Sequence, residues 1–320
     1  MMGVIGVIGL LYESSEWSDY KLAAELAEAG CDVRMIDLAV GDERDWRAEA
    51  VAVHEALSCD MLVSRIFASA VFRGHGFVHA RMQSLAAGAK RLDIPMINPL
   101  RAHFFEIDKR SAVEGLARAG VDVPRVQACG MPCELLPLAG ALAPAGKDGG
   151  SKALLDAARG LAFPCIIKPN CGGRTTYTAV ARTADEARAF LEAAPAIEFI
   201  VEDYIEPERG FITRVELVDG VCALVVKRSV VDGGLSAYHL GSHYELYPEC
   251  PETIRAEAEL AGRALSIEFG SFDIIENGGH AYVIDANSVS NVSPDNTETF
   301  GGFDLMREYA QAIAKKIQNL

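Results

Sequence analysis

Two lysines stand in settings that suit the binding of an anion. Lys109 lies early in the predicted helical segment Asp108-Lys109-Arg110, and Lys168 ends the apolar run 163–167. A lysine at the end of a buried strand is costly unless its ammonium group reaches solvent or meets an anion, and phosphate is a suitable anion. Extension of the ammonium group into water is the alternative for either lysine alone.

A short loop rich in glycine and hydroxyl groups directly follows Lys168. Its sequence is Asn170-Cys171-Gly172-Gly173-Arg174-Thr175-Thr176. Glycines let backbone N–H groups approach phosphate oxygens closely, and the hydroxyl groups add donors. The loop lacks the Gly-Lys-Ser/Thr run and the following helix of a P-loop, so a plain turn is the alternative.

Three side chains with oxygen donors lie in two predicted strands near the C-terminus. Asp285 and Asn287 are two positions apart, so they share one face of their strand, and a hairpin brings Asp273 alongside. Carboxylate and amide oxygens on one face suit Mg²⁺, which also takes water and substrate phosphates as ligands. A solvated sheet face is the alternative.

Alternating elements in the first hundred residues must position part of this chemistry. The spacing predicts strands at 4–11, 32–38, 61–67 and 94–98, separated by helices at 19–29, 47–57 and 75–92, with Ser18 as the first helix cap. Such alternation is typical of a parallel sheet with helices on both faces. Gly3, Gly6 and Gly9 lie within the first strand, so they do not form the turn of a dinucleotide-binding motif.

The remainder of the chain predicts a different architecture. Residues 130–150 read as a loop-rich connection, followed by helices at 151–160 and 185–194 and strands at 165–169 and 176–182. Asp219-Gly220 and Asn277-Gly278-Gly279 predict two hairpins, because these residues accept the positive φ of tight turns. Amphipathic helices at 251–269 and 303–319 are expected to cover one face of the resulting antiparallel sheet.

The bulk composition excludes several classes of function. The chain has 320 residues and a formal net charge of −15, which argues against general binding to nucleic acid or anionic membranes. The apolar run at 4–11 is too short to span a bilayer. Eight cysteines without a CxxC pair indicate reduced thiols and a cytoplasmic protein.

The order of these segments resembles that of ATP-grasp enzymes. The resemblance is carried by Asp108-Lys109, Pro164 to Pro169, Gly172-Gly173-Arg174, Val201-Glu202-Asp203-Tyr204-Ile205, Thr213-Arg214-Val215, Asp273 and Asp285-Ala286-Asn287. The sequence is most similar to the RimK-like branch, which adds glutamate to peptides or proteins, with glutathione synthetases as relatives. The resemblance implies an α/β fold with an α+β C-terminal part. It implies a parallel domain at 1–99, a central lid domain at 100–200 and a catalytic domain at 201–320, with ATP between the last two.

The resemblance also implies roles for individual residues. It implies that Lys109, Lys168, Gly172, Gly173 and Arg174 contact ATP phosphates, and that Glu202, Asp203, Tyr204 and Ile205 form the strand that binds adenine. It implies that Asp273, Asp285 and Asn287 hold two Mg²⁺ ions. Arg214, Arg228 and Asn287 are then the catalytic residues, and the two arginines stabilise the transferred phosphoryl group and the tetrahedral intermediate.

Two departures limit what the resemblance implies about the substrate. The central metal ligand of such enzymes is usually Glu, whereas this chain has the shorter Asp285. The stretch 288–296 is longer and richer in hydroxyl groups than the Ser-Pro-Gly loop of related enzymes. Glutamate specificity is therefore not transferred to this chain.

The expected activity is that of an ADP-forming ligase that joins a carboxylate to an amine or a thiol through an acyl-phosphate. An amino acid or a small peptide-like molecule is the expected substrate class. The alternatives are an ATP-grasp phosphotransferase, a non-catalytic nucleotide-binding protein and a dinucleotide-dependent oxidoreductase. The oligomeric state stays open, with a homodimer as the commonest state of soluble enzymes.

Overall fold

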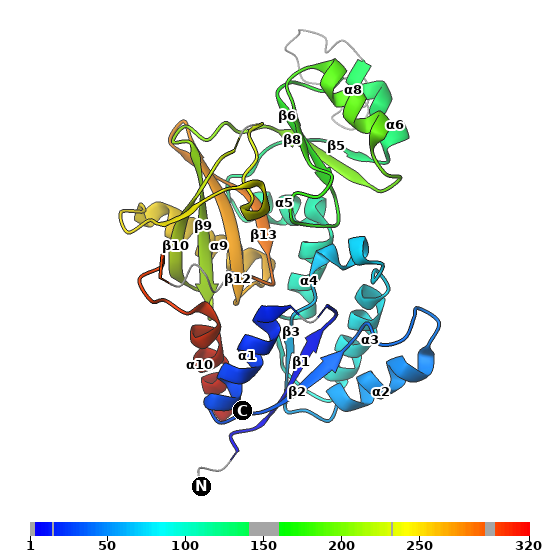
Figure 1. Cartoon of the computed structure of the whole chain (residues 1–320), viewed down its shortest axis with the longest axis vertical. Helices are drawn as coiled ribbons and strands as arrows, with labels where there is room; N and C mark the ends of the chain where they lie inside the picture. Colours follow the sequence, from blue (N-terminus) through cyan, green and yellow to red (C-terminus); the bar gives the residue numbers. More distant parts are fainter. Residues whose placement is uncertain (1–3, 15, 141–159, 232, 292–297) are drawn as a thin grey trace.

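Three β-sheets organise the chain (Figure 1). The computed structural model describes residues 4–14, 16–140, 160–231, 233–291 and 298–320. In the described part, a four-stranded sheet, a second four-stranded sheet and a five-stranded sheet follow one another along the sequence. Among these residues, no helix combines the length and the apolar character needed to cross a membrane.

The N-terminal sheet is parallel, as predicted. Its strands, in the order β2-β1-β3-β4, are β1 (Val7–Tyr12), β2 (Asp32–Asp37), β3 (Met61–Ser64) and β4 (Met96–Ile97). The helical segments around it are α1 (Trp17–Glu28), α2 (Trp46–Ala56), α3 (Val78–Arg91) and the 3₁₀ helix η1 (Ala68–Arg73). Its strands alternate with helices because each apolar strand run is followed by an amphipathic segment that covers it.

The start of helix α1 differs from the prediction, whereas Gly9 lies within β1 as predicted. Helix α1 begins one residue before Ser18, and Asp19 accepts the backbone N–H of Glu16 at 3.0 Å. The hydroxyl of Ser18 instead accepts a hydrogen bond from Arg65 at 2.7 Å, so Ser18 is a tertiary contact and not a cap. A Cβ at Gly9 would lie 2.8 Å from Leu62, so this glycine permits close strand packing.

The central sheet is antiparallel and carries the glycine loop. Its strands, in the order β5-β8-β6-β7, are β5 (Val126–Gly130), β6 (Cys165–Pro169), β7 (Ala179–Ala181) and β8 (Phe199–Asp203). Helices α6 (Pro132–Gly140) and α8 (Ala184–Ala193) pack together beside it. Strand β8 pairs entirely within this sheet, although it crosses position 200, where the sequence suggested a boundary.

The prediction of a loop at 130–150 is wrong for residues 132–140, which form helix α6. Residues 132–140 are helical even though Pro137 removes one backbone donor from the helix. Burial of Leu135 and Ala139 in the core of the central sheet offsets that loss. Residues 141–150, and almost all of the helix predicted at 151–160, lie outside the described residues. The strand predicted at 176–182 shortens to β7 because Tyr177 takes a left-handed φ of 53°.

The C-terminal sheet is antiparallel and contains both predicted hairpins. Its strands, in the order β11-β10-β9-β12-β13, are β9 (Phe211–Val218), β10 (Val221–Ser229), β11 (Tyr244–Leu246), β12 (Gly270–Asn277) and β13 (His280–Asn287). Gly278 and Gly279 have φ values of 59° and 82° and form the second turn. Asp219 and Gly220, at 54° and 76°, form the first. Positive φ at both central positions is the geometry that the Asp-Gly and Gly-Gly pairs predict.

Helices cover this sheet differently from the prediction. Helix α9 (Glu252–Leu265) packs on the sheet together with α4 (Leu100–Ile107) and α5 (Lys109–Arg118). Helix α10 (Leu305–Gln318) does not share that face. It lies against α1 (Figure 1), and one core contains residues of both terminal sheets with Tyr309 and Ile313 of α10. The wide apolar face of α10 therefore joins the N-terminal and C-terminal sheets.

Candidate active site

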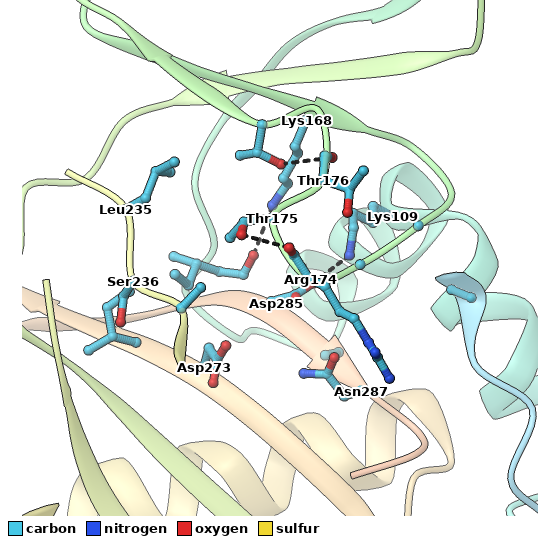
Figure 2. A pocket seen from close by; sticks show the side chains of 18 of the residues that line it. Lys109, Lys168, Arg174, Thr175, Thr176, Leu235, Ser236, Asp273, Asp285 and Asn287 are labelled. Carbon is cyan, nitrogen blue, oxygen red and sulfur yellow. Dashed lines mark hydrogen bonds and ion pairs between the residues drawn. The ribbon is translucent and has the colours of Figure 1, made fainter. Parts of the chain in front are cut away.

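The predicted site residues surround one cavity between the three sheets. The cavity has a volume of about 520 Å³. Every residue that the sequence singled out lines it: Lys109, Lys168, Gly172, Gly173, Arg174, Glu202, Asp203, Tyr204, Ile205, Arg214, Arg228, Asp273, Asp285 and Asn287. Figure 2 shows side chains from the central and C-terminal sheets pointing toward one another across this space. The structure thus brings together residues separated by up to 178 positions in the chain.

The two lysines meet carboxylates at the cavity. Lys109 is the first residue of α5, and its Nζ lies 2.6 Å from Oδ1 of Asp285. Nζ of Lys168, on β6, lies 2.8 Å from Glu202 and donates to the carbonyl of Ile284 at 2.9 Å. Lys168 is only 9% exposed, so its ammonium group does not simply extend into water. Both cations are placed for an anion that enters the cavity.

The glycine loop lines the cavity, and Figure 2 shows its residues Arg174, Thr175 and Thr176 beside Lys109 and Lys168. Gly172 has a φ of 142°, and a Cβ there would lie 2.4 Å from the ring of Phe72 in the N-terminal part. Arg174 forms an ion pair with Glu16, and the Thr175 hydroxyl lies 3.3 Å from Nε2 of His239. Gly172 therefore allows the loop to pack closely against the segment that contains Phe72, which a plain turn would not require.

Strands β12 and β13 place the three predicted metal ligands side by side. Asp273 pairs across the strands with Asp285, and Asn287 lies two residues further along the same strand. The register shifts after this pair, so Ile284 is an extra residue in β13. Such a bulge re-aims neighbouring side chains. Here the carbonyl of Ile284 faces Lys168 while Asp285 faces Lys109.

Cations compensate the paired carboxylates. Asp273 accepts from Arg228 at 2.7 Å and from Arg214 at 3.3 Å. Burial alone would raise the pKa of Asp285, but Lys109, Lys168 and Arg228 outweigh burial and hold that pKa below its ordinary value. Asp285 is therefore ionised at neutral pH, as a metal ligand must be.

Strand β8 offers a polar edge to the cavity. Oε2 of Glu202 contacts Lys168, whereas its buried Oε1 has no hydrogen-bond partner within the described residues. The Tyr204 hydroxyl donates to the carbonyl of Gly234 at 3.0 Å, which fastens the end of β8 to the segment 233–237. A buried acceptor without a partner is costly, so a ligand N–H is the natural group to meet Glu202.

The donor set fits magnesium better than zinc. Among the described residues, no group of three or more His, Cys, Asp or Glu is arranged to hold a metal. Asp273, Asp285 and the Asn287 amide supply oxygen donors on one wall of the cavity. Mg²⁺ characteristically takes one or two carboxylates and completes its shell with water and phosphate oxygens. The residues present therefore fit a magnesium–phosphate complex.

Several lining residues escaped the sequence analysis. Glu16 lies just after β1, and Phe67 and Ser69 follow β3. Strands β1 and β3 are neighbours whose connections leave in opposite directions, and ligands bind at such points in parallel sheets. That rule could have indicated these residues. Ser236 accepts a hydrogen bond from Nε of Arg228 at 2.9 Å, but no motif marks it.

One family model matches more than half of the chain. Residues 142–313 match the model of the RimK-like ATP-grasp domain. A comparison with curated protein sequences found no match.

Solved structures with the same fold cover almost the whole chain. D-cycloserine synthetase DcsG matches with a TM-score of 0.63, 18% identity and coverage of 98% of this chain and 100% of that protein. A RimK domain ATP-grasp protein from Sphaerobacter thermophilus matches with a TM-score of 0.63, 17% identity and coverage of 96% and 98%. D-alanine–D-alanine ligase from Bacillus anthracis, complexed with ATP, matches with a TM-score of 0.64, 15% identity and coverage of 98% and 99%.

These likenesses establish a shared fold, and the matched domain contains most of the residues that line the cavity. The glycine loop, the two lysines and the acidic residues of β12 and β13 all line the same cavity. The chain belongs to the RimK-like ATP-grasp family.

Proposed function

We propose that the protein is an ADP-forming ligase that uses ATP and Mg²⁺ to join a carboxylate to an amine or a thiol. The observation that carries this proposal is the pairing of Asp273 with Asp285 on one wall of the cavity, opposite Lys109 and Lys168. Phosphoryl transfer from ATP uses a metal ion, which carboxylates can bind, and cationic side chains that bind the phosphates.

The reaction has two steps in this proposal. An oxygen of the substrate carboxylate attacks the γ-phosphorus of ATP, and ADP leaves, which gives an acyl-phosphate. The amine or thiol then attacks the acyl carbon, phosphate leaves, and the attacking group loses its proton. Asp273, Asp285 and Asn287 would hold Mg²⁺, and the bound ion would neutralise charge on the phosphate oxygens.

Side chains of this protein supply the remaining charge stabilisation. Lys109 and Lys168 are placed to bind phosphate oxygens once ATP competes with their present carboxylate partners. Arg214 and Arg228 are buried beside Asp273, so their guanidinium groups are fixed before charge develops on the phosphoryl group. The loop around Gly172 covers the cavity and would exclude water that hydrolyses an acyl-phosphate.

Carboxylate-dependent and amine-dependent ADP release tests the proposal. The purified protein is incubated with ATP and Mg²⁺ against a panel of amino acids, dipeptides and thiols, singly and in pairs. ADP release that requires a carboxylate together with an amine or thiol supports the ligase. ADP release with one substrate alone and a phosphorylated product would instead establish a phosphotransferase. Nucleotide binding without turnover across the panel would establish a binding protein.

A further inference from the structure

Glu106 is a buried carboxylate that joins three parts of the molecule. It lies in the last turn of α4 and is 7% exposed. Its Oε1 accepts the backbone N–H of Ala68 at 3.1 Å, and its Oε2 accepts the backbone N–H of Ser288 at 2.9 Å and also the Ser288 hydroxyl. Ala68 begins η1 after the N-terminal strand β3, and Ser288 directly follows β13.

Three donors converge on this carboxyl group, so only an acceptor satisfies them all. Both oxygens of the carboxyl group accept a backbone N–H here, one from Ala68 and one from Ser288. A glutamine of the same shape has one acceptor oxygen, and its NH₂ group would face either the Ala68 or the Ser288 backbone donor. The substitution would thus leave a buried backbone N–H without a partner at one end of the bridge.

Other contacts fix the same end of β13. Asn98, just before α4, donates to the carbonyl of Ser288 at 2.8 Å and accepts the backbone N–H of Phe269 at 3.0 Å. A Cβ at Gly270 would lie 2.2 Å from the carbonyl oxygen of Asn287. The backbone of Asn287 is therefore held between strand β12 on one side and the Ser288 anchors on the other.

We propose that Glu106 is a positioning residue for magnesium. Through Ser288 it holds Asn287 in place beside Asp273 and Asp285, and through Ala68 it ties that place to the N-terminal wall of the cavity. Glu106 lines the cavity, but both of its carboxyl oxygens are engaged by Ala68 and Ser288, so in this proposal it acts through these residues and not as a metal ligand. This inference rests on the metal assignment within the proposed function.

The test measures how much Mg²⁺ tightens nucleotide binding, without any turnover. A non-hydrolysable ATP analogue is titrated by calorimetry into wild type and Glu106→Gln, with Mg²⁺ and with a chelator. Loss of a residue that orients a metal ligand typically costs about 10- to 100-fold in metal affinity. In Glu106→Gln the tightening by Mg²⁺ should therefore fall about tenfold, whereas the metal-free affinity should stay within about twofold of wild type.

Two further variants separate positioning from loss of stability. Glu25 is also buried, at 6% exposure, and its carboxylate contacts Lys21 and Arg307 away from the cavity. Glu25→Gln should lower the melting temperature and keep the full Mg²⁺ effect. Ser288→Ala removes only the hydroxyl donor, so it should lose part of the Mg²⁺ effect, and it decides the matter if Glu106→Gln does not fold.

The outcomes separate three claims: the positioning role, the metal assignment and the ligase proposal. An undiminished Mg²⁺ effect in Glu106→Gln, or in Ser288→Ala when Glu106→Gln is unfolded, overturns the positioning role. An equal loss in Glu25→Gln also overturns it, because the effect would then follow stability alone. A wild type without any Mg²⁺ effect overturns the metal assignment and this inference with it. A wild type with the Mg²⁺ effect but without acceptor-dependent ADP release overturns the ligase proposal alone.

Discussion

At the scale of single residues, Lys168 tests the phosphate site. Lys168→Ala should weaken ATP binding by about 1.5–3 kcal/mol, the worth of a charge-assisted hydrogen bond, or roughly 10- to 150-fold in Kd. The variant should also lose some thermal stability, because Glu202 is buried and would keep a charge without its 2.8 Å partner. Calorimetry with ATP and a melting curve measure the two effects. Lys90→Ala, an exposed lysine of α3, is the control, and ATP affinity equal to wild type in Lys168→Ala would remove Lys168 from the site.

Asp285 tests the metal assignment and has a defined pH dependence. Asp285→Asn should lower turnover by orders of magnitude, since the Mg²⁺ that would neutralise the phosphoryl charge loses one of its carboxylate ligands. Because cations surround Asp285 and lower its pKa, its charge stabilises the fold at neutral pH. That contribution is fully present above the ordinary carboxyl pKa of 3.8 and is lost as the pH falls through the lowered value.

Denaturant unfolding at several pH values checks this sign. The stability difference between wild type and Asp285→Asn should be constant from pH 7 to about pH 5 and shrink below about pH 4. A variant that is more stable than wild type at pH 7 would show that repulsion from Asp273 outweighs the cations. Near-normal turnover at saturating Mg²⁺ would show that Asp285 is not a metal ligand.

At the scale of elements, the glycine loop should respond to nucleotide. Residues 172–178 dock on other segments mainly through side chains of partial exposure, including the Arg174–Glu16 ion pair. Nucleotide phosphates beneath the loop should slow its amide hydrogen exchange when an ATP analogue and Mg²⁺ are added. Equal exchange rates with and without the analogue would contradict a lid. Exchange in α9, on the far side of the C-terminal sheet, is the internal reference.

Gly172 tests whether the docking of this loop matters. An alanine there must take a φ of 142° and would meet Phe72 at 2.4 Å, so the loop should shift from its docked position. Gly172→Ala should weaken ATP binding by about tenfold, because the clash with Phe72 adds to the backbone strain and together they oppose the docked loop by about 1–2 kcal/mol. Gly74→Ala is the control, since Gly74 also has a positive φ, of 81°, but no atom within 4 Å of the new Cβ. Equal effects in the two variants would attribute the loss to backbone strain alone.

At the scale of the whole molecule, the shared core should make the terminal sheets unfold together. Ile313 of α10 is 1% exposed and lies in a core that contains residues of both sheets. Ile313→Ala should cost about 2–5 kcal/mol and raise hydrogen exchange in β1 and β9 alike. Leu191→Ala, in the separate core of the central sheet, should raise exchange in β6 and leave β1 near wild type. Exchange that rises in β1 but not in β9 would show that the terminal sheets are independent. The domain boundaries predicted after residues 99 and 200 stay a prediction.

Local patterns in the sequence were sufficient for much of the site. Alternation of strands and helices predicted the parallel sheet, and Asp-Gly and Gly-Gly pairs predicted the turns that juxtapose β9 with β10 and β12 with β13. Period-two spacing put Asp285 and Asn287 on one face, because side-chain direction in a strand depends only on neighbouring residues. The family followed from the order of such motifs.

Contacts between distant residues were decided only by the tertiary structure. The sequence gives no signal that Glu106 meets Ser288, 182 positions away, or that Arg65 binds Ser18 and displaces it as a cap. It placed α10 on the same sheet face as α9, because an amphipathic stripe shows that a face is buried and not what buries it. It read 132–140 as a loop, because local propensity cannot register the packing of Leu135 that offsets Pro137. Strand direction and turn geometry depend on neighbouring residues, so short stretches of sequence determine them. The contacts between distant residues depend on how all the elements pack together, so only the tertiary structure decides them.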